Sequence, residues 1–134
     1  MKTAVIYWSG TGNTEALANA AAEGAGVSAT AVSDFSGDVA DYEALILGCP
    51  AMGDEVLEES EFEPFFTDNE SKLSGKKVLL FGSYGWGDGA WMRSWQDRVT
   101  AAGAELVGGE GFIVNDSPSD DDLAKIKELA AQFA

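Results

Sequence analysis

Histidine is absent from this sequence of 134 residues, and cysteine occurs once. Without histidine the chain cannot build a Ser-His-Asp triad, a Cys-His pair, or a zinc or haem site with histidine ligands. A single cysteine, Cys49, excludes an internal disulfide and a metal site made of several cysteines. Cys49 ends the apolar run 44–49, so we expect a buried thiol rather than a reactive one.

Basic residues are also few, because eight Lys and Arg stand against 23 Asp and Glu, a formal net charge of −15. A surface of that sign argues against binding to nucleic acid or to an anionic membrane and favours protein partners with basic patches. No apolar run approaches the roughly 20 residues of a membrane-spanning helix. The chain opens on an apolar strand without a signal-peptide cleavage region, so we expect a cytoplasmic protein.

Apolar residues make up 46% of the chain, which predicts one folded domain over residues 1–134. Short apolar runs bounded by Gly, Ser or Pro are typical of strands in a parallel sheet that is covered on both faces. Such runs occur at residues 3–7, 44–49, 77–82 and, less regularly, at 105–107 with 112–114. A weaker run, residues 27–32, alternates in polarity and fits an edge strand.

Patterns of helical period separate these runs, at residues 14–23, 60–73, 91–102 and 119–133. Asn13 and Thr14 are possible caps for the first helix, Gly103 is placed to end the third, and Ser119 with Asp122 resembles a capping box. Strand and helix therefore alternate, with about five strands, which predicts an open, doubly wound α/β sheet. Ligands of such sheets bind beyond the carboxyl ends of the strands.

The loop after the first predicted strand has the composition of a phosphate-binding turn. It consists of Ser9, Gly10, Thr11, Gly12, Asn13 and Thr14. Glycines allow a close backbone approach, and a helix start offers unpaired N–H groups and a positive dipole end. No Lys or Arg occurs between Lys2 and Lys72, so this is no Walker A loop, and Glu15 stands where a dinucleotide fingerprint needs its third glycine. We predict a terminal phosphate held by neutral donors.

Two later loops have the composition of a slot for a flat ring. One consists of Pro50, Ala51, Met52, Gly53, Asp54 and Glu55, and the other of Ser83, Tyr84, Gly85, Trp86, Gly87, Asp88 and Gly89. Trp86 is predicted to be an exposed stacking platform, whereas Trp91 and Trp95, one helical turn apart, are predicted core residues. Met52 is either a soft partner for the opposite ring face or a gap filler, and Glu55 either accepts from a ring N–H or is a solvated charge.

These segments carry a family resemblance. VIYWSGTGNTE (5–15) resembles the FMN-phosphate signature of flavodoxins, and AMGDEVLEESEFEPF (51–65) and LFGSYGWGDG (80–89) resemble the two flavin-flanking loops of the short-chain, clostridial type. The resemblance covers essentially the whole chain, and no insertion interrupts the predicted fifth strand. It implies a three-layer, doubly wound fold with a five-stranded parallel sheet in the order 2-1-3-4-5. It also implies an electron carrier rather than an enzyme. Such a carrier transfers single low-potential electrons as its one non-covalent FMN alternates between the semiquinone and hydroquinone states.

The resemblance assigns roles to individual residues. The phosphate would be held by Ser9, Thr11, Asn13 and Thr14, by the N–H groups of Gly10 and Gly12, and by Ser83. The ring would lie between Met52 and Trp86, with Glu55 accepting from its N3–H and backbone groups of Gly53, Asp54, Gly85, Trp86 and Gly89 at its polar edge. The implied partners of this monomer are basic-patched redox proteins, namely flavodoxin or ferredoxin reductases and low-potential oxidoreductases. We expect the acidic side chains of Asp54, Glu58, Glu59 and Glu61 to lower the second reduction potential.

Two other functions stay open at this point. A small FMN-dependent NAD(P)H or quinone reductase on the same fold would need a second pocket beside the flavin and usually a basic group for the nucleotide phosphate. A signalling or phosphate-binding domain is the other alternative. A phospho-acceptor receiver would place paired acids after the first strand, where this chain has Tyr7, Trp8 and Ser9.

Overall fold

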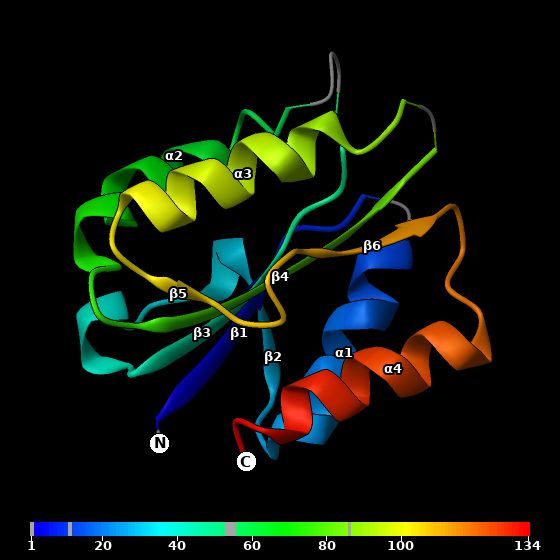
Figure 1. Cartoon of the computed structure of the whole chain (residues 1–134), viewed down its shortest axis with the longest axis horizontal. Helices are drawn as coiled ribbons and strands as arrows, with labels where there is room; N and C mark the ends of the chain where they lie inside the picture. The colour runs from blue at the N-terminus through cyan, green and yellow to red at the C-terminus, as the bar shows by residue number, and fades with distance from the viewer. Residues whose placement is uncertain (1, 11, 53–55, 86) are drawn as a thin grey trace.

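The computed structural model describes residues 2–10, 12–52, 56–85 and 87–134, and a parallel sheet forms its middle layer (Figure 1). The strands are β1 (Thr3–Tyr7), β2 (Ala29–Ala31), β3 (Ala44–Gly48), β4 (Lys77–Tyr84), β5 (Glu105–Leu106) and β6 (Phe112–Asn115). Their order is β2-β1-β3-β4-β5, with β6 also paired to β4, and every pairing is parallel. This order confirms the predicted doubly wound sheet.

The fifth position of the sheet is shared by two short strands. β5 pairs with β4 at Lys77 and Val78, and β6 pairs with the later part of β4, from Phe81 to Tyr84. Between them, Gly108 and Gly109 have φ values of 81° and 80°. A strand cannot continue through two left-handed residues, which explains why the fifth strand was predicted as two separate apolar runs, residues 105–107 and 112–114.

Helices cover both faces of the sheet (Figure 1). The α-helices are α1 (Asn13–Ala25), α2 (Phe62–Asn69), α3 (Ala90–Ala101) and α4 (Asp120–Ala131), and the 3-10 turns are η1 (Val32–Asp34), η2 (Val39–Asp41) and η3 (Glu70–Lys72). α1 and α4 lie on one face, and α2 and α3 on the other. Three of the predicted helices agree with α1, α3 and α4 within two residues at each end, and α2 is the short helix predicted within residues 60–73.

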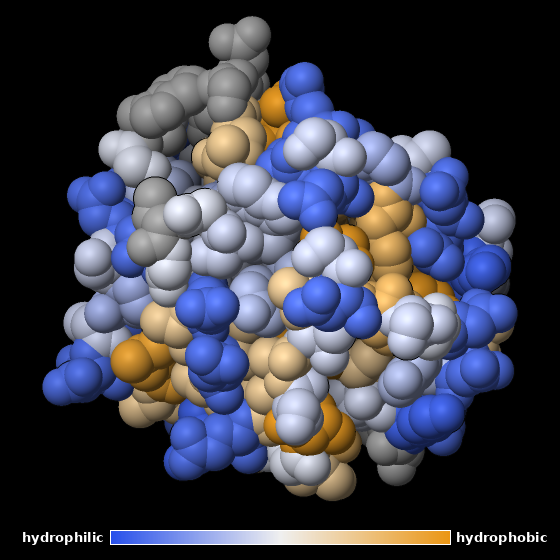
Figure 2. Space-filling model, turned by 180° about the vertical axis from the view of Figure 1, so that it is seen from behind, coloured by the Kyte–Doolittle hydropathy of each residue, from blue (hydrophilic) through white to orange (hydrophobic). Residues whose placement is uncertain are grey.

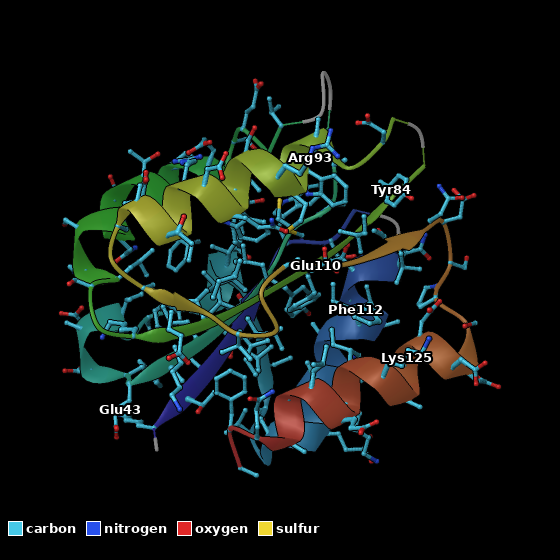
Figure 3. The ribbon with its side chains drawn as sticks, in the orientation of Figure 1. Glu43, Tyr84, Arg93, Glu110, Phe112 and Lys125 are labelled. Carbon is cyan, nitrogen blue, oxygen red and sulfur yellow. The ribbon has the colours of Figure 1, made fainter. Side chains whose placement is uncertain are left out.

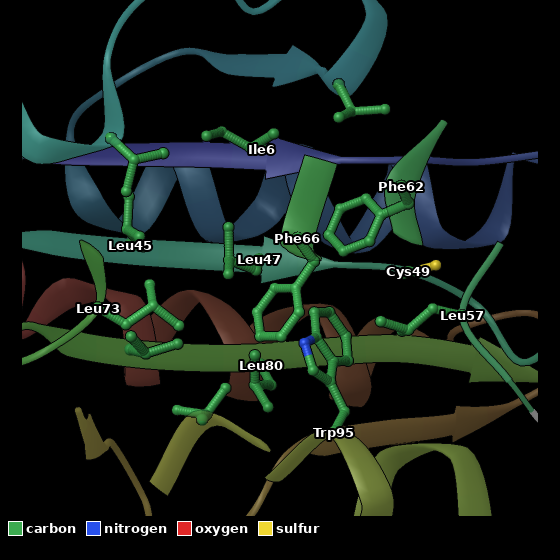
Figure 4. Close-up of a cluster of buried hydrophobic side chains, with 14 of the residues drawn as sticks. Ile6, Leu45, Leu47, Cys49, Leu57, Phe62, Phe66, Leu73, Leu80 and Trp95 are labelled. Carbon is green, nitrogen blue, oxygen red and sulfur yellow. The ribbon is translucent and has the colours of Figure 1, made fainter. Parts of the chain in front are cut away.

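Alternate side chains of the buried strands enter two separate cores. Leu47 and Leu80 point toward α2 and α3 and belong to the cluster of Figure 4, while Ile46 and Leu79 belong to the cluster under α1 and α4. Because both faces are covered, nearly every residue of these strands is buried, which explains their continuous hydrophobic runs. Trp95 is 1% exposed in the first cluster, as is Trp91, so both tryptophans are core residues as predicted.

The helix termini follow the predicted capping residues at two of three positions. The N–H of Asp122 donates to Ser119 Oγ at 3.1 Å and the N–H of Ser119 donates to Asp122 Oδ2 at 2.9 Å, which is a reciprocal capping box. Gly103, at φ 90°, follows the end of α3. Within the described ranges no helix has both the length and the apolar character needed to cross a membrane.

Candidate functional site

A cavity of about 240 Å³ opens where β1, β3 and β4 end at the same edge of the sheet. All three loops that the sequence predicted contribute to it. Its lining consists of Trp8, Gly10, Asn13, Pro50, Ala51, Met52, Ser83, Tyr84, Gly85 and Asp116. The topology therefore brings together segments that are more than 70 residues apart in the chain.

The first loop enters α1 through Gly12, which has φ 95° and is the N-cap residue. Gly12, in its left-handed conformation, is the N-cap residue, so α1 begins at Asn13. Asn13 and Thr14 therefore lie in the first turn of α1, and the expectation that they cap it is wrong. Ser9 supplies the side-chain acceptor at the start of the helix instead, because its Oγ accepts from the N–H groups of Gly12 at 3.1 Å and Glu15 at 3.2 Å.

A buried hydroxyl pair joins the first loop to the third. Thr14 Oγ1 and Ser83 Oγ lie 3.0 Å apart, and the two residues are 1% and 5% exposed. Ser83 belongs to the carboxyl end of β4, so this hydrogen bond ties the start of α1 to the strand that leads into the third loop. Both hydroxyls belong to residues that the family resemblance assigned to the phosphate.

The second loop supplies an apolar edge to the cavity. Met52 and Val56 exchange two backbone hydrogen bonds of 2.9 Å, and the N–H of Ala51 donates to the carbonyl of Ser83 at 3.1 Å. The side chains of Met52 and Val56 are 36% and 38% exposed, which is unusual for large apolar residues on this molecule. The predicted site residues Gly53, Asp54 and Glu55 lie between them and outside the described residues.

Three lining residues were given no role in the sequence-based prediction: Trp8, Pro50, which was named only as part of the second loop, and Asp116. The Trp8 indole lies so close to Gly10 that a Cβ there would come within 3.0 Å of its Cη2, and Trp8 Nε1 donates to Glu61 Oε1 at 3.2 Å. Asp116 has φ 58°, and its N–H donates to the carbonyl of Tyr84 at 2.8 Å. The position of Asp116 just after a strand was the available signal, since ligands gather beyond strand ends.

The end of the third loop, residues 87–89, leads into α3 and is not among the described residues that line the cavity. Gly89, at φ 91°, is the N-cap of α3, and Gly87 has φ 86°. Arg93 donates to the carbonyl of Asp88 at 2.9 Å and to Asp88 Oδ1 at 3.0 Å. Arg93 and Tyr84 lie near the same end of the molecule (Figure 3). The predicted site residues Thr11 and Trp86 lie outside the described residues.

The acidic run behind the second loop is not a uniform solvated face. Arg98 donates to Glu63 and Glu70 at 2.7 Å each and thereby joins α2 and η3 to α3. Glu58 is 6% exposed and accepts from the backbone N–H groups of the next turn. Glu58 therefore differs from Glu59 and Glu61, the exposed acids with which it was grouped by sequence. Burial raises the pKa of Glu58, but these hydrogen bonds outweigh burial, and its pKa lies below the ordinary value.

The cavity fits a phosphorylated flat-ring cofactor such as FMN by the chemistry of its lining. Trp8, Met52 and Tyr84 provide apolar surface, while the hydroxyls of Thr14 and Ser83 and the start of α1 provide neutral donors for an anion. Among the described residues, no group of three or more His, Cys, Asp or Glu is placed to hold a metal ion.

Comparison with known proteins agrees with this geometry. The family model for flavodoxin matches residues 5–129. The chain is 51% identical to a flavodoxin of Megasphaera elsdenii, over 97% of this chain and 96% of that protein. It is 51% identical to a flavodoxin of Clostridium beijerinckii, over 87% and 88% respectively. The solution structure of two-electron reduced Megasphaera elsdenii flavodoxin superimposes with a TM-score of 0.86 at 46% identity, covering 97% of this chain and 98% of that one.

Proposed function

Because the chain belongs to the flavodoxin family, whose members are low-potential electron carriers that contain FMN, we propose that its carboxyl-end cavity holds one FMN non-covalently. The observation that carries this proposal is the convergence of three loops on one cavity, joined by the Thr14–Ser83 hydroxyl pair. A flavodoxin is an electron-transfer protein, and the FMN supplies the ring that accepts and releases electrons.

The first loop would hold the phosphate without a cation. The groups that we assign to it are the side chains of Ser9, Thr11, Asn13, Thr14 and Ser83 and the N–H groups of Gly10 and Gly12. The start of α1 at this loop supports this assignment, since the helix dipole favours an anion there. Hydrogen bonds to a charged group contribute about 1.5–3 kcal/mol each, so this end of the site would dominate selection of FMN over unphosphorylated flavin.

The second and third loops would hold the ring. We assign its two faces to Met52 and Trp86, its N3–H to Glu55, and its remaining polar edge to backbone groups of the residues Gly53, Asp54, Gly85, Trp86 and Gly89. The position of Met52 and Gly85 in the cavity lining supports this assignment. These residues orient the ring and exclude water from it, while the exposed edge formed by Met52 and Val56 leaves an apolar contact surface for a partner.

The partners of a flavodoxin are redox proteins, and we propose that those of this monomeric, single-domain carrier bear basic patches and share the cytoplasm with it. The net charge of −15 supports basic partners. On the face seen from behind, hydrophilic side chains lie along much of the outline and apolar ones show in smaller patches between them (Figure 2). Basic partners would be attracted to such a surface before they reach the apolar edge at Met52.

Titration with FMN and with riboflavin, followed by the loss of flavin fluorescence, tests the proposal. We expect one FMN per chain and an affinity for riboflavin lower by at least about a hundredfold, which corresponds to roughly two lost charge-assisted hydrogen bonds. Equal affinities would contradict the assignment of the phosphate site. Reduction of the bound FMN by NADPH alone, without an added reductase, would contradict the carrier function and support a reductase.

A further inference from the structure

Glu58 accepts hydrogen bonds from four consecutive backbone N–H groups. Its carboxylate takes those of Ser60 at 2.9 Å, Glu61 at 2.7 Å and Phe62 at 2.9 Å, and its carbonyl takes that of Glu63 at 2.8 Å. The Ser60 hydroxyl donates to the same carboxylate. The N–H groups of Phe62 and Glu63 are among those that the start of α2 leaves unpaired, and those of Ser60 and Glu61 lie in the turn just before it. An ionised carboxylate is the strongest side-chain acceptor for such groups.

Among the residues that the structure describes, no other side chain caps this helix start. The N-cap residue of α2 is Glu61, which makes no side-chain cap bond, and its carboxylate accepts from Trp8 instead. Glu58 therefore caps α2 from three residues before the N-cap position. With 6% exposure, its carboxylate is enclosed by the turn that it holds together and is not part of the solvated acidic surface.

The backbone of Glu58 is tied to the end of β3. Its N–H donates to Cys49 Sγ at 3.3 Å, and the N–H of Cys49 donates to the carbonyl of Phe81 in β4 at 3.1 Å. Leu57, next to Glu58, is 4% exposed in the core cluster that contains Phe62 (Figure 4). Glu58 thus lies where three parts of the fold meet: the end of β3, the core, and the first turn of α2.

The described residues of the second loop, 50–52 and 56–57, are here called the strap, and the two backbone hydrogen bonds between Met52 and Val56 join its two parts. The strap follows Cys49 directly and is held near its start by the hydrogen bond from the N–H of Ala51 to the carbonyl of Ser83. Its far end is held by Leu57 and Glu58. Pro50, Ala51 and Met52 of the strap line the cavity.

We propose that Glu58 is a positioning residue for cofactor binding, which fixes the strap in the conformation that places Met52 at the cavity. This inference rests on the proposed function, in that the cavity is taken to hold FMN. Glu58 acts through the strap and does not touch the cofactor. Its effect should therefore appear in the affinity for FMN and in the protection of the strap, and not only in the stability of α2.

The test compares Glu58→Gln with Glu59→Gln in the full chain. Both variants remove one negative charge from neighbouring positions, but Glu59 is exposed, and no side-chain bond to it occurs within the described residues. We expect the dissociation constant for FMN to rise about tenfold in Glu58→Gln, the size of a lost N-cap, and to change less than about twofold in Glu59→Gln. Ser60→Ala, which removes only the hydroxyl donor, should raise it by a smaller factor.

Amide hydrogen exchange of the cofactor-free chain gives a second readout. Residues 51–52 and 56–63 should exchange faster in Glu58→Gln than in Glu59→Gln, while the strands β1 and β4 keep their protection. A Glu58→Gln protein with a lower thermal midpoint but unchanged FMN affinity would overturn the inference, because Glu58 would then only stabilise α2. If Glu58→Gln does not fold, Ser60→Ala decides between the two results. Failure of the wild-type chain to bind FMN would contradict the proposed function, while the exchange data would still test the strap.

Discussion

The hydroxyl oxygens of Thr14 and Ser83 lie 3.0 Å apart in a buried contact, although the two residues are 69 positions apart in the chain. One belongs to the first turn of α1 and the other to the carboxyl end of β4. Each hydroxyl can donate once and accept twice, so one hydroxyl donates to the other and the second keeps its O–H available to donate to an anion. The contact links the phosphate loop directly to the strand that carries the third loop.

Thr14→Val should weaken the binding of FMN and leave that of riboflavin nearly unchanged. The substitution keeps the shape of the side chain but removes a donor and leaves the buried Ser83 hydroxyl unpaired, at a cost of about 1–3 kcal/mol. We expect FMN affinity to fall about tenfold or more in a fluorescence titration. Thr100→Val, at an exposed position of α3, is the control. An equal loss for both flavins would mean that Thr14 does not serve the phosphate.

Neutralising exposed acids near the second loop should raise the potential of the second one-electron reduction. A unit negative charge at about 10 Å disfavours an added electron by on the order of 1 kcal/mol before screening by salt. Glu59 and Glu61 are exposed and suited to this test, whereas Glu58 is buried as a cap and is left unchanged. We expect Glu59→Gln with Glu61→Gln to raise the potential in an anoxic titration. Electron transfer to a basic partner should also depend less on salt, and an unaltered salt dependence would count against steering by these charges.

The free energy of unfolding should decrease in acid because two glutamates are stabilised in their ionised form. Hydrogen bonds from Arg98 hold the pKa of Glu63 below its ordinary value of 4.5, and hydrogen bonds outweigh burial to lower that of Glu58. A pKa that is lowered in the folded state contributes stability above the unfolded value, and this contribution is lost as the pH falls through the folded value. Urea unfolding should thus show stability falling below about pH 4.5. The fall should be smaller in Glu63→Gln than in the exposed control Glu128→Gln, and identical slopes would refute the role of the Arg98 contact.

Gly24→Ala should destabilise the protein even though alanine is the better helix former. A Cβ at Gly24 would overlap the backbone carbonyl of Lys127 in α4, so α1 and α4 would have to move apart. Overpacking of this kind costs typically 1–3 kcal/mol, against a gain of about 1 kcal/mol in helix propensity. Asn19→Ala, at an exposed position of the same helix, should instead stabilise it slightly. The two thermal midpoints, measured side by side, should move in opposite directions.

The layered α/β fold could be predicted from local sequence patterns, because the elements that these patterns indicate are present in the tertiary structure. Continuous apolar runs predicted β1 and β3, because a strand covered on both faces has no polar side. The capping box of Ser119 and Asp122 needs contacts only three residues apart, so a sequence motif suffices to predict it. Loop composition likewise predicted seven residues that line the cavity: Gly10, Asn13, Ala51, Met52, Ser83, Tyr84 and Gly85.

Which member of a run of like residues is buried could not be predicted in this way. Glu58 looks like its acidic neighbours in the sequence, and only the turn into α2 buries its carboxylate against the backbone N–H groups of residues 60–62. The two apolar runs of the fifth strand could be recognised in the sequence, but the part of β4 with which each run pairs is set only in the folded sheet.

For this protein, the sequence alone determined the type of site, because small polar residues and glycines between a strand and a helix can serve an anion wherever the loop is placed. The tertiary structure decided which groups share that site. Trp8 and Asp116 line the cavity because β1 and β6 end at the same edge of the sheet, and the Thr14 hydroxyl meets that of Ser83 because α1 starts beside the end of β4. Pattern along a chain reports local backbone and burial, whereas a shared cavity is a property of strands that are neighbours only after folding.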